Sequence, residues 1–170
     1  MPKVNDSCNR IIGIDPGSLV TGWGIIDSSY YGRRLDLVSS GIISVKKEAF
    51  PYNLRLIFDG LKNVMEEYNP KIMALEAVFS GHNSKSLIKL SQARGVICLL
   101  SGILGIELKE YAPRYVKKSV TGYGAAGKEQ VKYMACEFLK DLKGKPLDDN
   151  ISDALSVAIS CATDMNNYLN

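Results

Sequence analysis

The sequence lacks a long apolar run. Its longest nearly apolar stretch, residues 95–105, is well short of the about 20 residues that a membrane-spanning helix needs. The segment from Met1 to Arg10 is polar and lacks the apolar core of a secretory signal. We therefore expect a protein that stays in the cytoplasm and has no membrane partner.

Histidine is scarce as well, and the cysteines are not arranged in pairs. His82 is the only histidine among 170 residues, and the four cysteines form no CxxC motif. These absences argue against a zinc site and against a disulfide framework. Reduced cysteines agree with a cytoplasmic protein.

A large excess of charge of one sign is also missing. The 21 Lys and Arg residues against 18 Asp and Glu residues leave a net charge of +3, which excludes a highly cationic tail protein and an acidic disordered one. Residues 146–170 contain four Asp and no Lys or Arg, so this segment carries −4 and the rest of the chain +7. Two interpretations stay open: an ordinary solvated surface, or a basic body that binds a polyanion around a local acidic cluster.

The hydrophobic residues, 46% of the chain, suffice for the core of one compact domain. Runs of β-forming residues predict five strands, and apolar residues at helical spacing predict five helices. The predicted strands span residues 10–15, 22–27, 35–45, 71–76 and 106–111, and the predicted helices span residues 54–68, 86–104, 114–121, 128–142 and 150–163. Three strands followed by strands that alternate with helices predict an α/β fold, with a mixed sheet flanked by helices.

Three acidic residues stand where such a fold can gather them. Asp15 and Glu76 each close a predicted strand, and Asp153 lies on the last helix, three residues after Asn150 and on the same face. Carboxylates that meet at one site repel one another, and a divalent cation such as Mg²⁺ relieves the repulsion and supports phosphodiester hydrolysis. Each acid also has an ordinary explanation: a turn at Asp15, a salt bridge at Glu76 and a helix N-terminal acid at Asp153.

Several ordered blocks of the sequence resemble one protein family. The blocks are IIGIDPGS (residues 11–18), TGWG (21–24), EAVF (76–79), KLSQARG (89–95), GYGAAGKEQV (122–131) and SDALSVAI (152–159). Their order and spacing closely resemble the RuvC family of crossover junction endodeoxyribonucleases, which are Holliday junction resolvases. The resemblance extends over residues 10–162.

The resemblance implies a ribonuclease H-like fold with a five-stranded mixed sheet. It implies a single nuclease domain over residues 1–170, with its core at residues 10–163. It also implies a homodimer that nicks four-way DNA junctions symmetrically in homologous recombination and repair, with Mg²⁺ or Mn²⁺ as cofactor and two ions in each active site. The partners that it implies are the junction itself and the RuvA and RuvB branch-migration proteins.

Position by position, Asp15, Glu76 and Asp153 match three of the family's four metal-binding catalytic residues, and Asn150 stands at the fourth. The family usually has Asp there, and occasionally His. Asn keeps a carbonyl oxygen but lacks the negative charge, so it binds a hard cation more weakly. The resemblance therefore implies a nuclease with weakened catalysis, and a junction-binding module that does not cut is the alternative.

Three explanations for Asn150 stay open. It is an introduced substitution that traps a DNA complex, a natural variant, or a change for which Asp148 or Asp149 compensates. We favour an introduced Asp→Asn change, because the rest of the motif is intact.

Further residues are candidates for DNA binding. Phe79 matches the position at which family members meet the junction crossover, where an aromatic ring can stack on an unpaired base; alternatively it is the last core residue of its strand. Lys117 and Lys128 match family lysines that support catalysis or phosphate binding. Lys85 and Arg94 are looser candidates, with a merely solvated side chain as the alternative for each lysine and arginine.

Junction resolution needs two nicks placed symmetrically, and a twofold dimer matches the symmetry of a four-way junction. The apolar helix predicted over residues 86–104 is our candidate for the dimer interface. A helix buried entirely inside one chain is the alternative.

Overall fold

The computed structural model describes residues 8–29, 34–46, 48–77 and 84–167. Within them, five strands form one sheet in the order β3-β2-β1-β4-β5. The strands are β1 (Asn9–Asp15), β2 (Val20–Ser29), β3 (Arg34–Ser44), β4 (Ile72–Glu76) and β5 (Glu107–Tyr111). β1 and β3 run antiparallel to β2, and β4 runs parallel to β1 and β5. The five-stranded mixed sheet predicted from the sequence is therefore confirmed.

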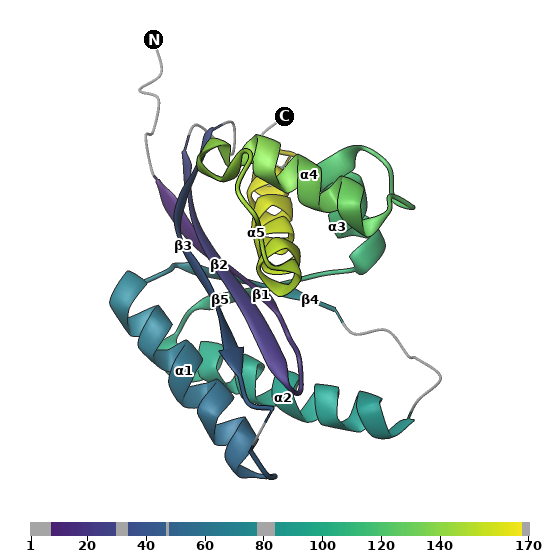
Figure 1. The fold of residues 1–170 in the computed structure, drawn as a ribbon. Helices are drawn as coiled ribbons and strands as arrows, with labels where there is room; N and C mark the ends of the chain where they lie inside the picture. Colours follow the sequence, from purple (N-terminus) through teal and green to yellow (C-terminus); the bar gives the residue numbers. More distant parts are fainter. Residues whose placement is uncertain (1–7, 30–33, 47, 78–83, 168–170) are drawn as a thin grey trace.

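Helices cover both faces of this sheet (Figure 1). The helices on one face are α1 (Tyr52–Tyr68) and α2 (Ser84–Leu104), and those on the other are α3 (Pro113–Thr121), α4 (Lys128–Phe138) and α5 (Asp149–Asn167). Each predicted helix corresponds to one of these, with shifted ends. The predicted α/β architecture with flanking helices is confirmed.

The helix predicted over residues 128–142 is wrong at its C-terminal end. α4 stops at Phe138, and a separate 3-10 turn, η1 (Lys140–Leu142), follows it. Leu139 between them has a non-helical backbone, with φ −104° and ψ 82°, and its side chain is fully buried in the core. The helix is interrupted where Leu139 turns inward, and apolar spacing alone does not distinguish a continuous helix from an interrupted one.

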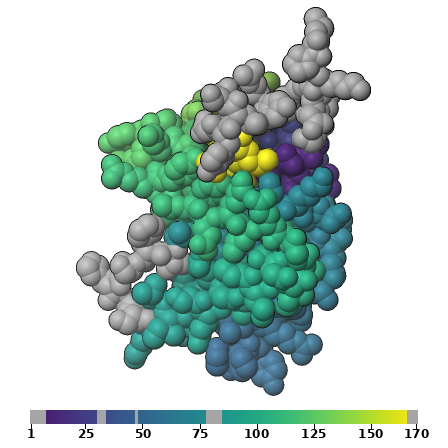
Figure 2. Space-filling model, turned by 180° about the vertical axis from the view of Figure 1, so that it is seen from behind, coloured from purple at the N-terminus to yellow at the C-terminus, as the bar shows by residue number. Residues whose placement is uncertain are grey.

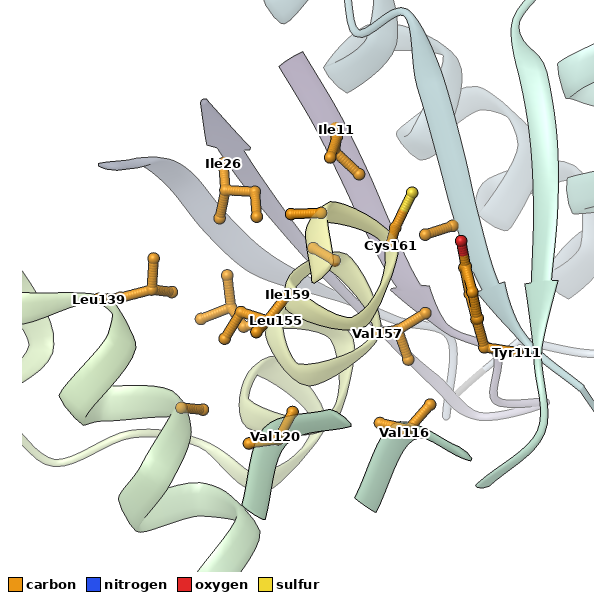
Figure 3. Packing of buried hydrophobic residues seen from close by; sticks show 14 of the residues in the cluster. Ile11, Ile26, Tyr111, Val116, Val120, Leu139, Leu155, Val157, Ile159 and Cys161 are labelled. Atoms are coloured by element: carbon orange, nitrogen blue, oxygen red, sulfur yellow. The ribbon is translucent and has the colours of Figure 1, made fainter. Parts of the chain in front are cut away.

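The central strand β1 is buried on both of its faces. Ile11 packs in the cluster under α3, α4 and α5, whereas Ile12 and Ile14 pack in the cluster under α1 and α2. Alternate residues of a strand point to opposite faces, so the apolar run of β1 contributes to both layers. Figure 3 shows the first cluster, in which Leu155 and Ile159 of α5 pack beside the strands.

Two glycines let α5 lie close to the sheet. A Cβ atom at Gly13 of β1 would lie 2.1 Å from the carbonyl oxygen of Ala154, and one at Gly22 of β2 would lie 2.1 Å from that of Asn150. Because atoms cannot approach so closely, any larger residue at either position would push α5 away from the strands. The glycines thus set the distance between the strand ends and the first turns of α5, which carry Asn150 and Asp153.

α2 leaves one apolar face uncovered. Its sheet-facing side packs through the fully buried Ala93, Ile97 and Leu100, whereas Leu99 and Ile103 are 59% and 58% exposed. By length and composition alone, residues 85–104 of this helix would suffice to span a bilayer, a property that core helices share. This segment is longer than the apolar stretch noted in the sequence because it also includes residues 85–94, which contain Lys85, Lys89 and Arg94.

Candidate active site

The ends of β1 and β4 place two acids on neighbouring strands. Ile14 of β1 pairs with Leu75 of β4, so the residues that follow, Asp15 and Glu76, end two adjacent parallel strands. Asp153 comes from α5, which packs on β1 and β2 through the two glycines described above. Three elements that are distant in the sequence therefore contribute one carboxylate each to the same end of the sheet.

The charges of these acids act on one another. Burial, together with the negative charges of Glu76 and Asp153, raises the pKa of Asp15 from 3.8 to about 7. The pKa of Glu76 is raised as well, by burial and by the charge of Asp153, while Lys117 and Lys128 oppose the shift. Ionising both Asp15 and Glu76 is therefore unfavourable unless a positive charge lies close to their carboxylates.

Lys128, in the first turn of α4, supplies part of that positive charge. Its Nζ lies 3.1 Å from Oδ2 of Asp153 and 3.5 Å from Oδ2 of Asp149. Partial burial lowers the pKa of Lys128, but hydrogen bonds and the charges of the two carboxylates raise it overall. Lys128 is therefore charged at neutral pH and partly neutralises the acids.

A cavity of about 200 Å³ lies at the same place. Glu76 and Asp153 line it together with Lys117 of α3 and Lys128 of α4, and its other walls are formed by Pro113, Val116, Val131 and Ser156. Carboxylates bind hard cations, and ammonium groups bind phosphate oxygens. The cavity therefore combines the groups needed to hold a metal ion and a phosphate next to each other.

The donor chemistry of the site fits a divalent metal ion. Carboxylate oxygens are ligands that Mg²⁺ and Mn²⁺ prefer, and a cation would relieve the repulsion that contributes to the raised pKa of Asp15. Within the part of the chain that the structure describes, no three His, Cys, Asp or Glu side chains already form a group that could hold an ion. Separations of about 4–8 Å between the carboxylates of Asp15, Glu76 and Asp153 stay a prediction.

Asn150 stands in the first turn of α5, close to Asp15. Asp15 pairs with Gly22 across β1 and β2, and the backbone of Asn150 packs directly on Gly22. The side-chain Nδ2 of Asn150 donates a hydrogen bond to Oδ1 of Asp148 at 3.0 Å, and the backbone N–H of Asn150 donates to the same oxygen at 2.8 Å. Asn150, which stands at the fourth position of the motif, is thus held next to Asp15 by the packing of α5. Asp148 contacts its side chain and its backbone.

Asp149 has different partners. Its Oδ1 lies 2.9 Å from Nζ of Lys132, and its Oδ2 lies 3.5 Å from Nζ of Lys128. Of the two acids considered as compensation for Asn150, Asp148 therefore contacts it and Asp149 pairs with lysines. Lys132 was not predicted from the sequence; its position one helical turn after Lys128 is the signal that would have indicated it.

The other predicted DNA-binding residues have varied surroundings. Lys117 and Lys128 line the cavity with the acids. Lys85 is exposed at the start of α2 and lines a separate groove, and Arg94, further along α2, forms an ion pair with a glutamate of β5. Phe79 lies outside the described residues. The structure therefore brings two of the predicted basic residues to the acids and places the other two on α2.

Two tyrosines, of β5 and α3, contact α5. The hydroxyl groups of Tyr111 and Tyr115 each donate to the carboxylate of Asp164 at 3.2 Å. The two tyrosine rings stack with their centroids 5.5 Å apart. These contacts tie β5 and the first turn of α3 to the C-terminal part of α5, and so help to set the position of Lys117 relative to Asp153.

Asp15→Asn is expected to stabilise the metal-free protein at alkaline pH. Because the pKa of Asp15 is raised in the folded state, the unfolded chain loses this proton first, and the folded state loses stability as the pH rises from about 4 towards 7. An amide has no proton to lose, so the variant escapes this loss, worth about 2–4 kcal/mol at pH 8. Thermal unfolding in EDTA at pH 5 and pH 8 measures the difference.

In that experiment, Asp59→Asn on the exposed surface of α1 is the matched control and should show no such pH-dependent gain. Adding Mg²⁺ at pH 8 should reduce the difference in stability between the parent chain and the Asp15→Asn variant, since a cation stabilises the carboxylate of the parent chain. An Asp15→Asn variant that is no more stable than the parent chain at pH 8 would contradict the raised pKa.

The fold and its strand-end acids define the class of protein. Two structures of RuvC from Thermus thermophilus share the fold, one of RuvC itself and one of RuvC in complex with a Holliday junction substrate. The former has a TM-score of 0.82 and 26% identity over 91% of this chain and 93% of that chain. The latter has a TM-score of 0.86 and 24% identity over 94% of this chain and 96% of that chain. The architecture is that of the ribonuclease H-like resolvases.

Sequence comparison identifies the family within this class. The family model for the crossover junction endodeoxyribonuclease RuvC matches residues 11–161. The chain is 44% identical over 149 residues to the RuvC of Photobacterium profundum, covering 88% of this chain and 84% of that protein. It is 45% identical over 149 residues to the RuvC of Methylococcus capsulatus, covering 88% and 87%. The chain belongs to the RuvC family of crossover junction endodeoxyribonucleases.

Proposed function

We propose that this chain resolves four-way DNA junctions by metal-dependent, symmetrical nicking, in homologous recombination and repair, and that it does so as a single nuclease domain. The observation that carries the proposal is the cavity in which Glu76 and Asp153 meet Lys117 and Lys128, with Asp15 electrostatically coupled to both acids. Family membership supports the choice of substrate, since the relatives are named crossover junction endodeoxyribonucleases.

In this proposal, Asp15, Glu76, Asp153 and Asn150 hold Mg²⁺ or Mn²⁺, with two ions in each site. When bound, such ions lower the pKa of an attacking water molecule and neutralise the phosphate. The chain's own contribution is positioning and charge. The carboxylates come from rigid strand ends and a helix, and Lys117 and Lys128 face the phosphate oxygens on which negative charge develops as the phosphorus–oxygen bond of the DNA backbone breaks.

Lys128 has two roles in this scheme. In the metal-free protein its ammonium group neutralises Asp153 at 3.1 Å. Once a cation occupies the carboxylates, the same ammonium group is free to pair with a phosphate, and Asp149 holds it nearby at 3.5 Å. The lysine thus exchanges one anionic partner for another without leaving the cavity.

The test of this function separates binding from cutting. A synthetic four-way junction is bound in Ca²⁺, and Mg²⁺ or Mn²⁺ is then added. We expect preferential binding of the junction over linear duplex, with affinity that falls as salt rises, and slow paired nicks that appear only after Mg²⁺ or Mn²⁺ is added. Equal affinity for junction and duplex, or nicking without a divalent ion, would contradict the proposal.

A junction-binding module that does not cut is the second candidate. Asn150 favours it, because the family usually has a charged ligand at this position. The experiment above decides between the two: binding in Ca²⁺ with no nicks in Mg²⁺ or Mn²⁺ at any enzyme concentration is the outcome that this second candidate predicts.

We further propose that the chain acts as a homodimer through the uncovered face of α2. Ile88, Leu99 and Ile103 are 57–59% exposed on this face, and Gly95 and Gly102 have open space beside their Cα atoms. In the view from behind, the teal surface that includes α2 is open to the viewer (Figure 2). A second copy of the chain would bury this apolar face and place two active sites in a twofold arrangement that suits two symmetrical nicks.

Leu99→Asp is therefore expected to convert the dimer to a monomer, because a buried carboxylate without a partner is strongly unfavourable at an apolar interface. Leu56→Asp, at an exposed leucine of α1, is the matched control and should leave the dimer intact. Light scattering at micromolar concentration measures the mass of each variant. A monomeric parent chain, or a dimeric Leu99→Asp variant, would contradict the interface.

The RuvA and RuvB branch-migration proteins are the partners that we propose for this resolvase, and the cytoplasm is its proposed location. Both proposals follow from membership of the RuvC family. Co-purification with RuvA and RuvB assembled on a synthetic junction tests the partnership, and a failure of the resolvase to join that assembly would contradict it.

A further inference from the structure

Asp148 and Asn150 form a pair that the nuclease motif does not explain. Oδ1 of Asp148 accepts two hydrogen bonds from Asn150, one from the backbone N–H at 2.8 Å and one from the side-chain Nδ2 at 3.0 Å. The carbonyl oxygen of Asp148 accepts the first backbone hydrogen bond of α5, from Ser152 at 2.9 Å. Asp148 is thus the N-terminal capping residue of α5, but the bond to the side chain of Asn150 is additional to capping.

The contact determines which way the amide of Asn150 faces. An ionised carboxylate only accepts hydrogen bonds, so the NH₂ group of the amide, and not its oxygen, is the end that faces Asp148. The amide oxygen is then the end left for another partner. Because the backbone and Cβ of Asn150 lie against Gly22, which pairs with Asp15, Asn150 stands beside this strand-end acid.

We propose that Asp148 is a positioning residue for Asn150: it orients the amide oxygen as a metal ligand and strengthens it as a donor. A hydrogen bond from an amide N–H to a carboxylate polarises the amide and increases the negative charge on its oxygen. Outer carboxylates act in this way on histidine ligands of metals, and their loss costs about 10–100-fold in metal affinity. The inference rests on the proposed nuclease function, because it concerns the metal ligands of that site.

Asp149 does not offer the same support. Its carboxylate is engaged by Lys132 at 2.9 Å and by Lys128 at 3.5 Å. Its charge is therefore shared with two ammonium groups, whereas the oxygen of Asp148 is shared with the amide and backbone of Asn150. Of these two acids, Asp148 is therefore the one that can support the side chain of Asn150.

The test measures Mn²⁺ binding to the full chain without DNA, by titration calorimetry and by the spin resonance signal of free Mn²⁺. Asp148→Ser keeps an oxygen that can cap α5 but removes the carboxylate, since Ser is as good a capping residue as Asp. We expect this variant to bind Mn²⁺ about 10-fold or more weakly than the parent chain. Thermal unfolding in EDTA confirms that the variant is folded.

The same change is then made in the Asn150→Asp background, where there is no amide to orient. We expect Asp148→Ser to alter Mn²⁺ affinity there by less than about 3-fold, because the capping and long-range charge effects of Asp148 are common to both backgrounds and only the amide contact differs. Equal losses in both backgrounds, or no loss in the parent chain, would show that Asp148 only caps the helix and overturn the inference.

The Asp153→Asn variant distinguishes a failure of the role proposed for Asp148 from a failure of the proposed nuclease function. If the parent chain binds Mn²⁺, and Asp153→Asn abolishes that binding while Asp148→Ser does not weaken it, the metal site stands and the role of Asp148 is wrong. If the parent chain binds no Mn²⁺, or binds it equally well after Asp153→Asn, both the metal site and this inference fail.

Discussion

Asp153→Asn is expected to slow junction cleavage by about 10²–10³-fold or more, the scale of losing a charged group that acts on the transition state. Asp153 lines the cavity with Glu76 and raises the pKa of both strand-end acids through its charge. An amide at this position cannot neutralise a cation. It also removes one of the two carboxylates that pair with Lys128 in the metal-free protein, leaving Asp149 at 3.5 Å.

The measurement is the single-turnover cleavage rate of a labelled four-way junction in Mg²⁺, with junction binding in Ca²⁺ measured in parallel. Because we expect Asn150 to weaken catalysis, the change is also introduced in the Asn150→Asp background, where we expect the rate before the change to be higher. Asp59→Asn, on the surface of α1, is the control and should leave the rate unchanged. Retention of the full rate by Asp153→Asn would remove this residue from the proposed metal ligands.

Asn150→Asp is expected to raise the cleavage rate by about 100-fold or more, which corresponds to several kcal/mol of transition-state stabilisation. Asn150 lies beside Asp15 at the start of α5, where a carboxylate would add negative charge to the proposed metal site. Junction affinity in Ca²⁺ should change much less. Any change in junction affinity should be a slight fall. Binding depends on lysine contacts to the DNA phosphates, and an added carboxylate repels those phosphates.

The outcome also decides among the explanations for Asn150. A large gain agrees with a site built for a charged fourth ligand, as an introduced Asp→Asn change would leave it. If the parent chain cuts junctions as fast as its Asn150→Asp form, a charge at this position is not required. Asp148 or Asp149 then becomes the better candidate for the fourth acid, and the hydrogen bond from Asn150 favours Asp148.

Much of the fold was determined by local sequence patterns. The apolar run over residues 10–15 predicted a strand, and β1 spans Asn9–Asp15. The spacing of apolar residues in α1 predicted a helix that ends before Pro70, and it ends at Tyr68. Such features depend on residues within a few positions of one another, so their pattern is visible in the sequence.

The limit of these patterns is visible at Leu139 and at Arg94. Leu139 fits the apolar spacing of a helix, yet it breaks α4, because its burial in the core outweighs one further helical turn. Arg94 was a candidate for DNA binding, and its guanidinium pairs with Glu110 of β5. Both outcomes depend on neighbours that are distant in the sequence, which spacing along the chain does not reveal.

The sequence by itself determined where the candidate acids stand, with Asp15 and Glu76 at strand ends and Asp153 on the last helix. Only the tertiary structure decided that Glu76 and Asp153 share a cavity with Lys117 and Lys128, and that Asp148 contacts Asn150. The physical reason is the close packing of α5 on the glycines of β1 and β2. That packing fixes the distance between acids whose positions in the sequence are far apart.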